Sequence, residues 1–294
     1  MKIIIAVLLV ASLFSSAAYA QITFGDPAEQ EVSVKISDNG DVHVTHHVKD
    51  SKKTQQVEFL SPDYTNFTII DEDNEEPQYA EASGQNPGIV LFPTKNNVTI
   101  EYDIPNAVKQ RSGMWTWDYR YLANTEFYLP SSVKLPYVNG NLIQLGNQKG
   151  IQCHGCQVFL EYELEPTIIT KQVEWEGKSF DVKIITLADI PKLDLDQPAK
   201  SLSFEVTEPG KHITLVIPRE LLWSPYDVAL NDKLILKQER LDVDGKVWLH
   251  IIPKEKGTLK ITGVSVVPEF PFATILVLST AMAAIVYTTR FSRR

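Results

Sequence analysis

Three consecutive stretches near the start of the chain read Glu31-Val32-Ser33-Val34-Lys35-Ile36, Asp38-Asn39-Gly40-Asp41 and Val42-His43-Val44-Thr45. Apolar and polar residues alternate in the first and third stretches, which is the pattern of a strand with one buried face. Asn-Gly between two alternating stretches is typical of the tight turn that joins a pair of antiparallel strands. This part of the sequence therefore predicts a β-hairpin.

Short β-rich runs separated by turn residues continue through the middle of the chain, and Asp244-Gly245 gives a second hairpin-turn signal. No long, strongly amphipathic helix interrupts the series. Many short strands at this spacing predict an all-β fold made of antiparallel β-sandwiches. Strands are expected at residues 56–60, 67–70, 88–92, 97–102, 115–122, 157–164, 168–174, 180–185, 201–206, 212–217, 228–230, 246–252 and 258–266.

The predicted domain boundary lies at Glu165-Pro166. The run from Val158 to Leu164 reads as a closing strand, and a new series of strands follows it. We therefore expect one β-sandwich domain over residues 21–165 and a second over residues 166–267. Both are long enough to bury a core of their own.

The first twenty residues predict a secretory signal peptide. Lys2 is followed by an apolar run to Phe14. The small residues Ala18 and Ala20 stand three and one positions before the expected cleavage between Ala20 and Gln21. The body of the protein is therefore expected outside the cytoplasm.

The other end predicts one transmembrane helix, from Pro271 to Thr289, with no charged residue in it. At about 1.5 Å per residue this segment spans roughly 28 Å, close to the hydrocarbon thickness of a bilayer. Arg290, Arg293 and Arg294 follow at once, and basic residues remain on the cytoplasmic side. Residues 268–294 are thus expected to anchor the body at the outer surface of the plasma membrane.

The charge of the chain narrows the range of partners. The formal net charge is −9, and four of the 28 basic residues, but none of the 37 acidic ones, lie within residues 1–20 and 270–294. The exported middle is therefore still more acidic, which disfavours nucleic acid as a partner. The membrane, other envelope proteins and glycans are the expected partners.

The motif Pro268-Glu269-Phe270, followed by the apolar segment and the basic end, resembles the carboxy-terminal sorting tails of archaeal surface proteins, such as those of ammonia-oxidising archaea. Residues 200–294 also resemble a small domain that often precedes such tails. The resemblance implies anchoring, and cleavage near the motif by an archaeosortase-like transpeptidase. Pro271 stands where those tails commonly have glycine.

Cys153-His154-Gly155-Cys156 is the most distinctive local motif, and it contains both cysteines of the chain. In an exported protein a local disulfide between Cys153 and Cys156 is the preferred interpretation. The alternative is a copper or zinc site, or a redox module, in which Cys153, His154 and Cys156 act with a distant histidine. His43 and His47 are the candidates for that ligand, because they share one face of a strand while His46 points away. Otherwise no cofactor is expected.

The run from Trp115 to Tyr121 places Trp115, Trp117, Tyr119 and Tyr121 on one strand face. Such an aromatic row either completes a core or forms a glycan-binding surface. The core interpretation is preferred, and a glycan-binding module stays an alternative.

Asn66-Phe67-Thr68 and Asn97-Val98-Thr99 are N-glycosylation sequons. His212 and His250 read as ordinary strand residues. Serine-hydrolase, zinc-protease, phosphate-loop and dinucleotide motifs do not occur in the sequence, and no catalytic residue is predicted. The expected function is therefore that of a non-enzymatic, membrane-anchored surface protein with a structural, adhesive or receptor-like role.

Overall fold

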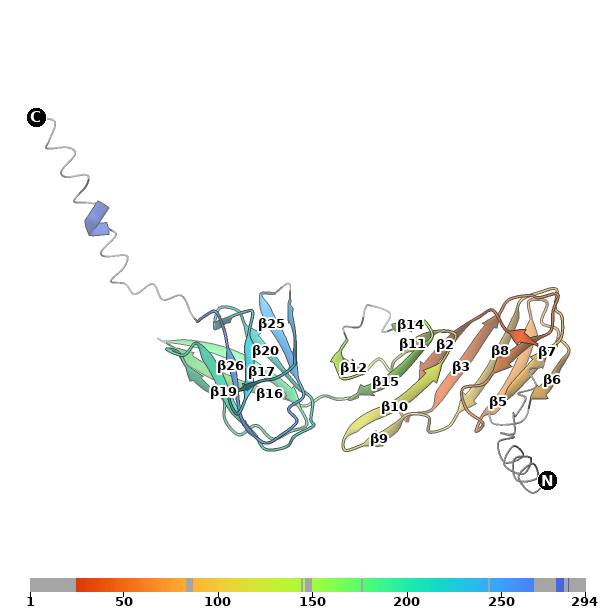
Figure 1. Cartoon of the computed structure of the whole chain (residues 1–294), viewed down its shortest axis with the longest axis horizontal. Coiled ribbons are helices and arrows are strands. Elements are labelled where there is room, and N and C mark those ends of the chain that lie inside the picture. Colours follow the sequence, from red (N-terminus) through yellow and green to blue (C-terminus); the bar gives the residue numbers. More distant parts are fainter. Residues whose placement is uncertain are drawn as a thin grey trace, which may run out of the picture. The chain divides into compact units, whose positions relative to one another are not determined.

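The computed structural model describes residues 25–82, 87–143, 145, 150–175, 177–242, 244–266, 279–282 and 285, with the side chains of Cys156 and Val266 left out. Figure 1 draws the body as β-strands joined by turns and loops. Most of the strand pairs among the described residues are antiparallel, whereas β1 pairs parallel with β4 and β11 pairs parallel with β2. The prediction of an all-β fold with antiparallel sheets is confirmed.

The predicted hairpin is present as β2 and β3, with Ile36 opposite Val42. Gly40 has a φ of +85°, which glycine adopts without strain, and its N–H donates to the carbonyl oxygen of Ser37. The hairpin lies in sheet B, whose order is β14-β11-β2-β3-β8-β5. The strands of this sheet are β2 (Gln30–Ile36), β3 (Val42–Val48), β5 (Thr65–Asp71), β8 (Val98–Ile104), β11 (Asn124–Tyr128) and β14 (Gly150–Cys153).

Sheet A has the order β1-β4-β7-β6. Gln55 and Val57 of β4 and all four residues of β7 are buried. Its strands are β1 (Asp26–Pro27), β4 (Gln55–Glu58), β6 (Tyr79–Ala82) and β7 (Gly88–Leu91). Sheet C has the order β13-β12-β15-β10-β9. Its strands are β9 (Lys109–Arg111), β10 (Met114–Tyr121), β12 (Pro136–Val138), β13 (Asn141–Leu142) and β15 (Cys156–Tyr162).

The described chain divides into two compact units. Unit 1 holds the described residues up to Lys109, within Tyr119–Pro130 and within Asn147–Gln157. Unit 2 holds those within Gln110–Asp118, within Ser131–Gly146 and from Val158 onward. Strands β10 and β15 each begin in one unit and end in the other, so this division differs from a single boundary at residue 165.

Unit 2 contains sheet D, with the order β16-β17-β20-β25-β24, and sheet E, with the order β18-β19-β26-β22-β23. Buried side chains from both sheets, such as Val182, Leu215, Phe204 and Ile261, form one hydrophobic core. Burying a side chain of this size stabilises a fold by about 1.5–3 kcal/mol. The strands are β16 (Ile168–Trp175), β17 (Lys178–Thr186), β18 (Asp194–Asp196), β19 (Ser201–Val206), β20 (Ile213–Pro218), β22 (Asp227–Leu230), β23 (Lys233–Leu234), β24 (Lys237–Leu241), β25 (Lys246–Ile251) and β26 (Gly257–Thr262), together with the short pair β21 (Leu222–Trp223) and β27 (Ser265–Val266).

Candidate functional site

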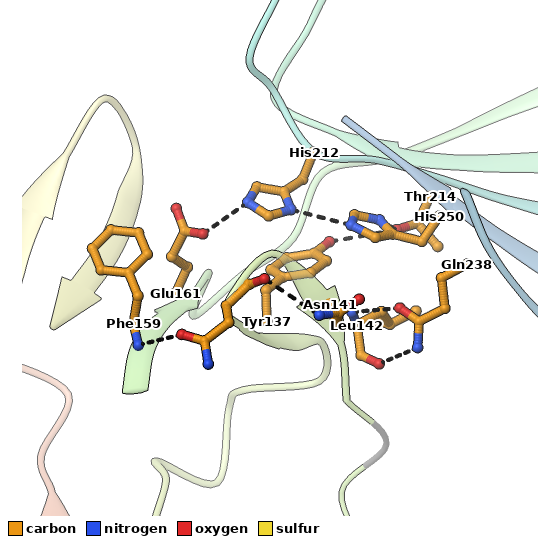
Figure 2. Close-up of polar contacts among 10 residues, drawn as sticks. Tyr137, Asn141, Leu142, Phe159, Glu161, His212, Thr214, Gln238 and His250 are labelled. Atoms are coloured by element: carbon orange, nitrogen blue, oxygen red, sulfur yellow. Dashed lines mark hydrogen bonds and ion pairs between the residues drawn. The ribbon is translucent and has the colours of Figure 1, made fainter. Parts of the chain in front are cut away.

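A buried row of polar side chains connects β15 with sheet D in unit 2, as Figure 2 shows. His212 precedes β20, and its Nε2 lies 3.1 Å from Glu161 Oε2 on β15. Its Nδ1 lies 3.3 Å from Nε2 of His250 on β25. His250 Nδ1 lies 3.0 Å from the Thr214 hydroxyl on β20. Thr214 and His250 meet because they are cross-strand partners.

One assignment of protons satisfies the three side-chain hydrogen bonds that link Thr214, His250, His212 and Glu161. The Thr214 hydroxyl donates to His250 Nδ1, and His250 Nε2–H donates to His212 Nδ1. His212 Nε2–H then donates to the Glu161 carboxylate. Each imidazole has one donor and one acceptor nitrogen, which is the neutral form. The row is therefore polarised toward a carboxylate at its end.

The surroundings favour the neutral forms of His250 and Tyr137. Burial, and secondarily a charge on His212, lower the pKa of His250 to about 4. The Tyr137 ring stacks on His212 with ring centroids 3.9 Å apart and lies 4.9 Å from His250. Burial raises the pKa of Tyr137 to about 12. The tyrosine and His250 thus carry no charge near neutral pH.

The β12–β13 hairpin fixes the position of Tyr137. Its turn residue Asn139 has a φ of +51°, which asparagine tolerates better than most residues. The Phe159 N–H donates to Asn139 Oδ1 at 2.9 Å. Gln238 on β24 accepts from the Leu142 N–H at 2.7 Å and donates to the Leu142 carbonyl oxygen at 2.9 Å (Figure 2). Gln238 therefore binds β13 much as a neighbouring strand would.

A cavity of about 360 Å³ adjoins the polar row. Glu161 and His212 form part of its wall, and Glu163 lies two residues beyond Glu161. Only 7% of Glu163 is exposed, and its Oε2 has no hydrogen-bond partner among the described residues. Burial raises the pKa of Glu163, against the opposing effects of the Thr167 backbone and nearby positive charges. The wall of the cavity thus contains Glu161, which accepts a hydrogen bond from His212, and Glu163, one oxygen of which has no hydrogen-bond partner among the described residues.

This arrangement can hold a ligand and pass a proton, but it does not present an attacking group. A nucleophilic hydroxyl must be activated by a base and must reach the substrate. Thr214, whose hydroxyl hydrogen-bonds His250, is completely buried. The Thr214 hydroxyl is therefore not placed to attack a substrate in the cavity.

The histidines predicted on β3 lie as expected. His43 and His47 occupy the polar face of sheet B, and His46 is completely buried on the other face. His43 Nδ1 lies 2.8 Å from Asp103 Oδ1. The alternation prediction is confirmed, and His43 pairs with a carboxylate on the sheet surface.

The buried His46 belongs to a closed network in unit 1. Its Nδ1 lies 2.7 Å from Gln30 Oε1, and the Tyr102 hydroxyl lies 2.9 Å from its Nε2. Gln30 Nε2 donates to the Tyr121 hydroxyl at 3.2 Å, which donates to the Glu58 carbonyl oxygen at 2.6 Å. Both ring nitrogens of a neutral His46 are matched by these partners, so the row stabilises the core.

The structure does not bring His43 or His47 to the cysteine motif, which corrects the full ligand set proposed for copper or zinc. Cys153 lies on β14, and β11 and β2 separate it from β3, a distance of about 14 Å at the usual strand spacing. Cys153 also pairs with the buried Thr125, so it lies on the opposite face of the sheet. Ligands of one zinc ion lie within about 2.3 Å of it.

The remaining cysteine chemistry stays a prediction, because the Cys156 side chain lies outside the described residues. His154 Nδ1 lies 2.7 Å from Asn124 Oδ1. In the part of the chain that the structure describes, no group of three or more histidine, cysteine, aspartate or glutamate side chains could hold a metal ion. Neither the disulfide nor the redox module is tested by these observations.

Both sequon asparagines are exposed, and both donate a hydrogen bond to a carboxylate. Asn66 Nδ2 donates to Asp103 at 2.7 Å, and Asn97 Nδ2 donates to Glu72 at 2.6 Å. Glycosylation at Asn66 and Asn97 stays a prediction.

The aromatic row on β10 is divided between two environments. Tyr119 and Tyr121 are buried in unit 1, where the Tyr119 hydroxyl lies 2.6 Å from the Thr125 hydroxyl. The core interpretation is confirmed for these two tyrosines. Trp115 and Trp117 are half-buried, so a glycan-binding surface stays a prediction for them alone.

The predicted signal peptide with Ala20 and Gln21, the Pro268-Glu269-Phe270 motif and Arg290, Arg293 and Arg294 lie outside the described residues. Of the predicted span from Pro271 to Thr289, residues 279–282 and 285 are described and helical. Within the described residues, no helix has both the length and the apolar character to cross a membrane.

The sequence interpretation missed Glu161, Glu163, His212 and His250 as members of a site. Glutamates at positions 161 and 163, at the end of a strand with the buried residues Val158 and Leu160, gave a usable signal. Carboxylates that a closing strand carries into a protein need a partner or a ligand. The histidines gave no such signal, because their pairing depends on the register of β20 and β25.

No protein-family model matches this sequence, and no curated protein matches it. Among solved structures, part of the chain is similar to an aminopeptidase N family protein from Idiomarina loihiensis, at 6% identity and a TM-score of 0.32. The match covers 51% of this chain and 31% of that protein. A similarity this slight carries no conclusion about the activity of the chain.

Proposed function

We propose that this chain is a non-enzymatic cell-surface protein with a receptor-like role. The observation that supports this role best is the cavity in unit 2, whose wall combines a satisfied polar row with the unsatisfied carboxylate of Glu163. Small-molecule sites are concave and have a few polar groups in fixed positions. A purely structural or adhesive protein does not need such a cavity.

Two β-sandwich domains outside the membrane and one C-terminal transmembrane helix form the proposed architecture. The support comes from the export signal before Gln21, the apolar segment from Pro271 and the basic residues after Thr289. The proposed partners are the membrane and other envelope proteins or glycans. An archaeosortase-like enzyme is a further proposed partner at Pro268-Glu269-Phe270.

The proposed disulfide between Cys153 and Cys156 pins the bend that leads from β14 to β15. Gly155 within that bend has a φ of +53°, a conformation that glycine adopts readily. The closed loop is short, so the bond removes little entropy from the unfolded chain and acts mainly on local geometry.

The test is the intact mass of the natively exported protein, with thiols alkylated before reduction, together with protease treatment of whole cells. We expect a chain that begins at Gln21, thiols that alkylate only after reduction, and a body that protease removes from intact cells. A body protected from protease would refute the surface location. Turnover of a substrate by the purified protein would refute the non-enzymatic role.

A further inference from the structure

The cavity beside the polar row has the size of a small-molecule site. Its volume of about 360 Å³ lies within the range of ligand pockets in proteins. The β9–β10 hairpin contributes Arg111 and Met114, and the segment before β20 contributes Lys211. Met114, Phe159 and Leu187 supply an apolar wall.

Glu163 is the group that the protein itself leaves incomplete. The Thr167 backbone hydrogen-bonds its carboxyl group. Oε2, however, has no partner among the described residues, and only 7% of the residue is exposed to solvent. Removing a carboxylate oxygen from water without a replacement hydrogen bond is unfavourable. Rotation about χ3 of glutamate is soft, so either carboxyl oxygen can turn toward the cavity.

The other carboxylate in the wall is already used. Glu161 accepts from His212, whose second nitrogen accepts from His250. A hydrogen-bond donor that enters the cavity therefore finds its acceptor in Glu163 rather than in Glu161. A protonated amine is the donor that a carboxylate binds most strongly.

Positive groups balance the carboxylates of the wall. Arg111 is exposed on β9, and Lys211 Nζ donates to the Ser112 carbonyl oxygen at 3.3 Å. The two basic side chains of the wall, Arg111 and Lys211, equal its two glutamates in number. A ligand that carries one charge of each sign is complementary to this wall, whereas a ligand of one sign meets repulsion as well as attraction.

We propose that this cavity binds a free α-amino acid with an apolar side chain. The ammonium group of the ligand donates to Glu163, its carboxylate faces Arg111, and its side chain packs on the wall that contains Phe159. This assignment rests on the proposed receptor-like function and names its ligand class.

The test is isothermal titration calorimetry of the purified full chain in detergent with L-leucine, L-methionine and L-phenylalanine. Phenethylamine and 3-phenylpropionate, which lack the carboxylate and the amine respectively, are the matched comparisons for phenylalanine. We expect saturable binding of at least one amino acid, and weaker binding of both comparison compounds. No heat from any of the three amino acids up to about 10 mM, a limit near the weakest measurable affinity, would overturn the proposal.

Variants locate the site. We expect Glu163→Gln to weaken amino-acid binding by about 10-fold to 100-fold, the loss typical of a charged hydrogen bond, and to leave phenylpropionate binding unchanged. Glu165→Gln, an exposed glutamate two residues further on, is the matched control. Arg111→Gln should weaken the binding of amino acids but not of phenethylamine. Unchanged amino-acid binding by Glu163→Gln would overturn the assignment.

A measurement of thermal stability distinguishes a loss of binding from a loss of folding. Since Glu163 Oε2 lacks a partner, Glu163→Gln should fold with a thermal midpoint at or above that of the wild type, so loss of binding does not reflect unfolding. Conversion of a bound amino acid to a product would refute the non-enzymatic function and leave the site intact. Absence of the chain from the cell surface would refute the location alone.

Discussion

Lowering the pH should decrease the free energy of unfolding of unit 1, because His46 is buried there in its neutral form. His46 is far in sequence from the polar row of unit 2. Burial, with a smaller contribution from the His47 charge, lowers the pKa of His46 from 6.5 to about 3. Between these values the unfolded state binds a proton that the folded state does not, so stability falls as the pH falls below about 6.5. The loss amounts to about 1.4 kcal/mol per pH unit, or about 3 kcal/mol at pH 4.5.

The hydrogen bonds around His46 explain why a proton is not accommodated. His46 Nδ1–H donates to Gln30, and the Tyr102 hydroxyl donates to His46 Nε2. The Leu60 N–H donates to the same hydroxyl at 3.0 Å. A proton on Nε2 would face a hydroxyl that already points its hydrogen toward the ring. The network would have to reverse, and a charge would remain in the core without a carboxylate.

The assay is urea unfolding of the full chain between about pH 7 and pH 4.5, compared with His46→Asn. Asparagine retains a donor for Gln30 but does not titrate in this range. Other groups also titrate, so the measured quantity is the difference between the two pH slopes. His47→Asn, at the exposed neighbour on the polar face, is the control. Equal slopes for wild type and His46→Asn would refute the reasoning, as would a charged His46 imidazole in the wild-type NMR spectrum at pH 5.

Three substitutions test other parts of the fold by urea or thermal unfolding. Gly88→Ala would place a Cβ 2.1 Å from the Val57 carbonyl oxygen, so it should cost about 3 kcal/mol or prevent β4–β7 pairing, and an unchanged midpoint would contradict that close approach. Gln238→Ala removes both hydrogen bonds to the Leu142 backbone and should cost about 1–3 kcal/mol, whereas a loss below 0.5 kcal/mol would mean that β13 does not need them. Tyr121→Phe removes a buried hydroxyl between a side-chain donor and a backbone acceptor and should also cost about 1–3 kcal/mol, a prediction that a neutral effect would refute.

The parts of the fold that depend on neighbours in sequence could be predicted. Asn39-Gly40 and the alternation around it determine the β2–β3 hairpin, because the turn and the period of two act within a few residues. The same period separates the buried His46 from the exposed His47. Local patterns therefore predicted the fold class and the division of the β3 histidines between two faces, but not the burial of His46.

Pairings between distant strands could not be predicted in this way. β11 lies parallel to β2, with Phe127 opposite Val34, although about ninety residues separate them. No local pattern in either strand identifies the strand that pairs with it, because many alternating strands have equivalent inner faces. For the same reason the sequence analysis predicted one boundary at residue 165, whereas β10 and β15 each pass from one unit to the other.

The two buried histidine networks show why residue type alone did not reveal the candidate site. The row around His46 ends on a backbone carbonyl group and contains no carboxylate, so it is complete without any further molecule. The row around His212 ends on Glu161 beside a cavity, where a positive charge on the imidazole would lie 3.1 Å from a carboxylate. A second acidic residue, Glu163, then remains without a donor for one oxygen among the described residues. His46, whose network is complete, stabilises the core. His212 hydrogen-bonds only one of two neighbouring carboxylates, so the other carboxylate can bind a ligand.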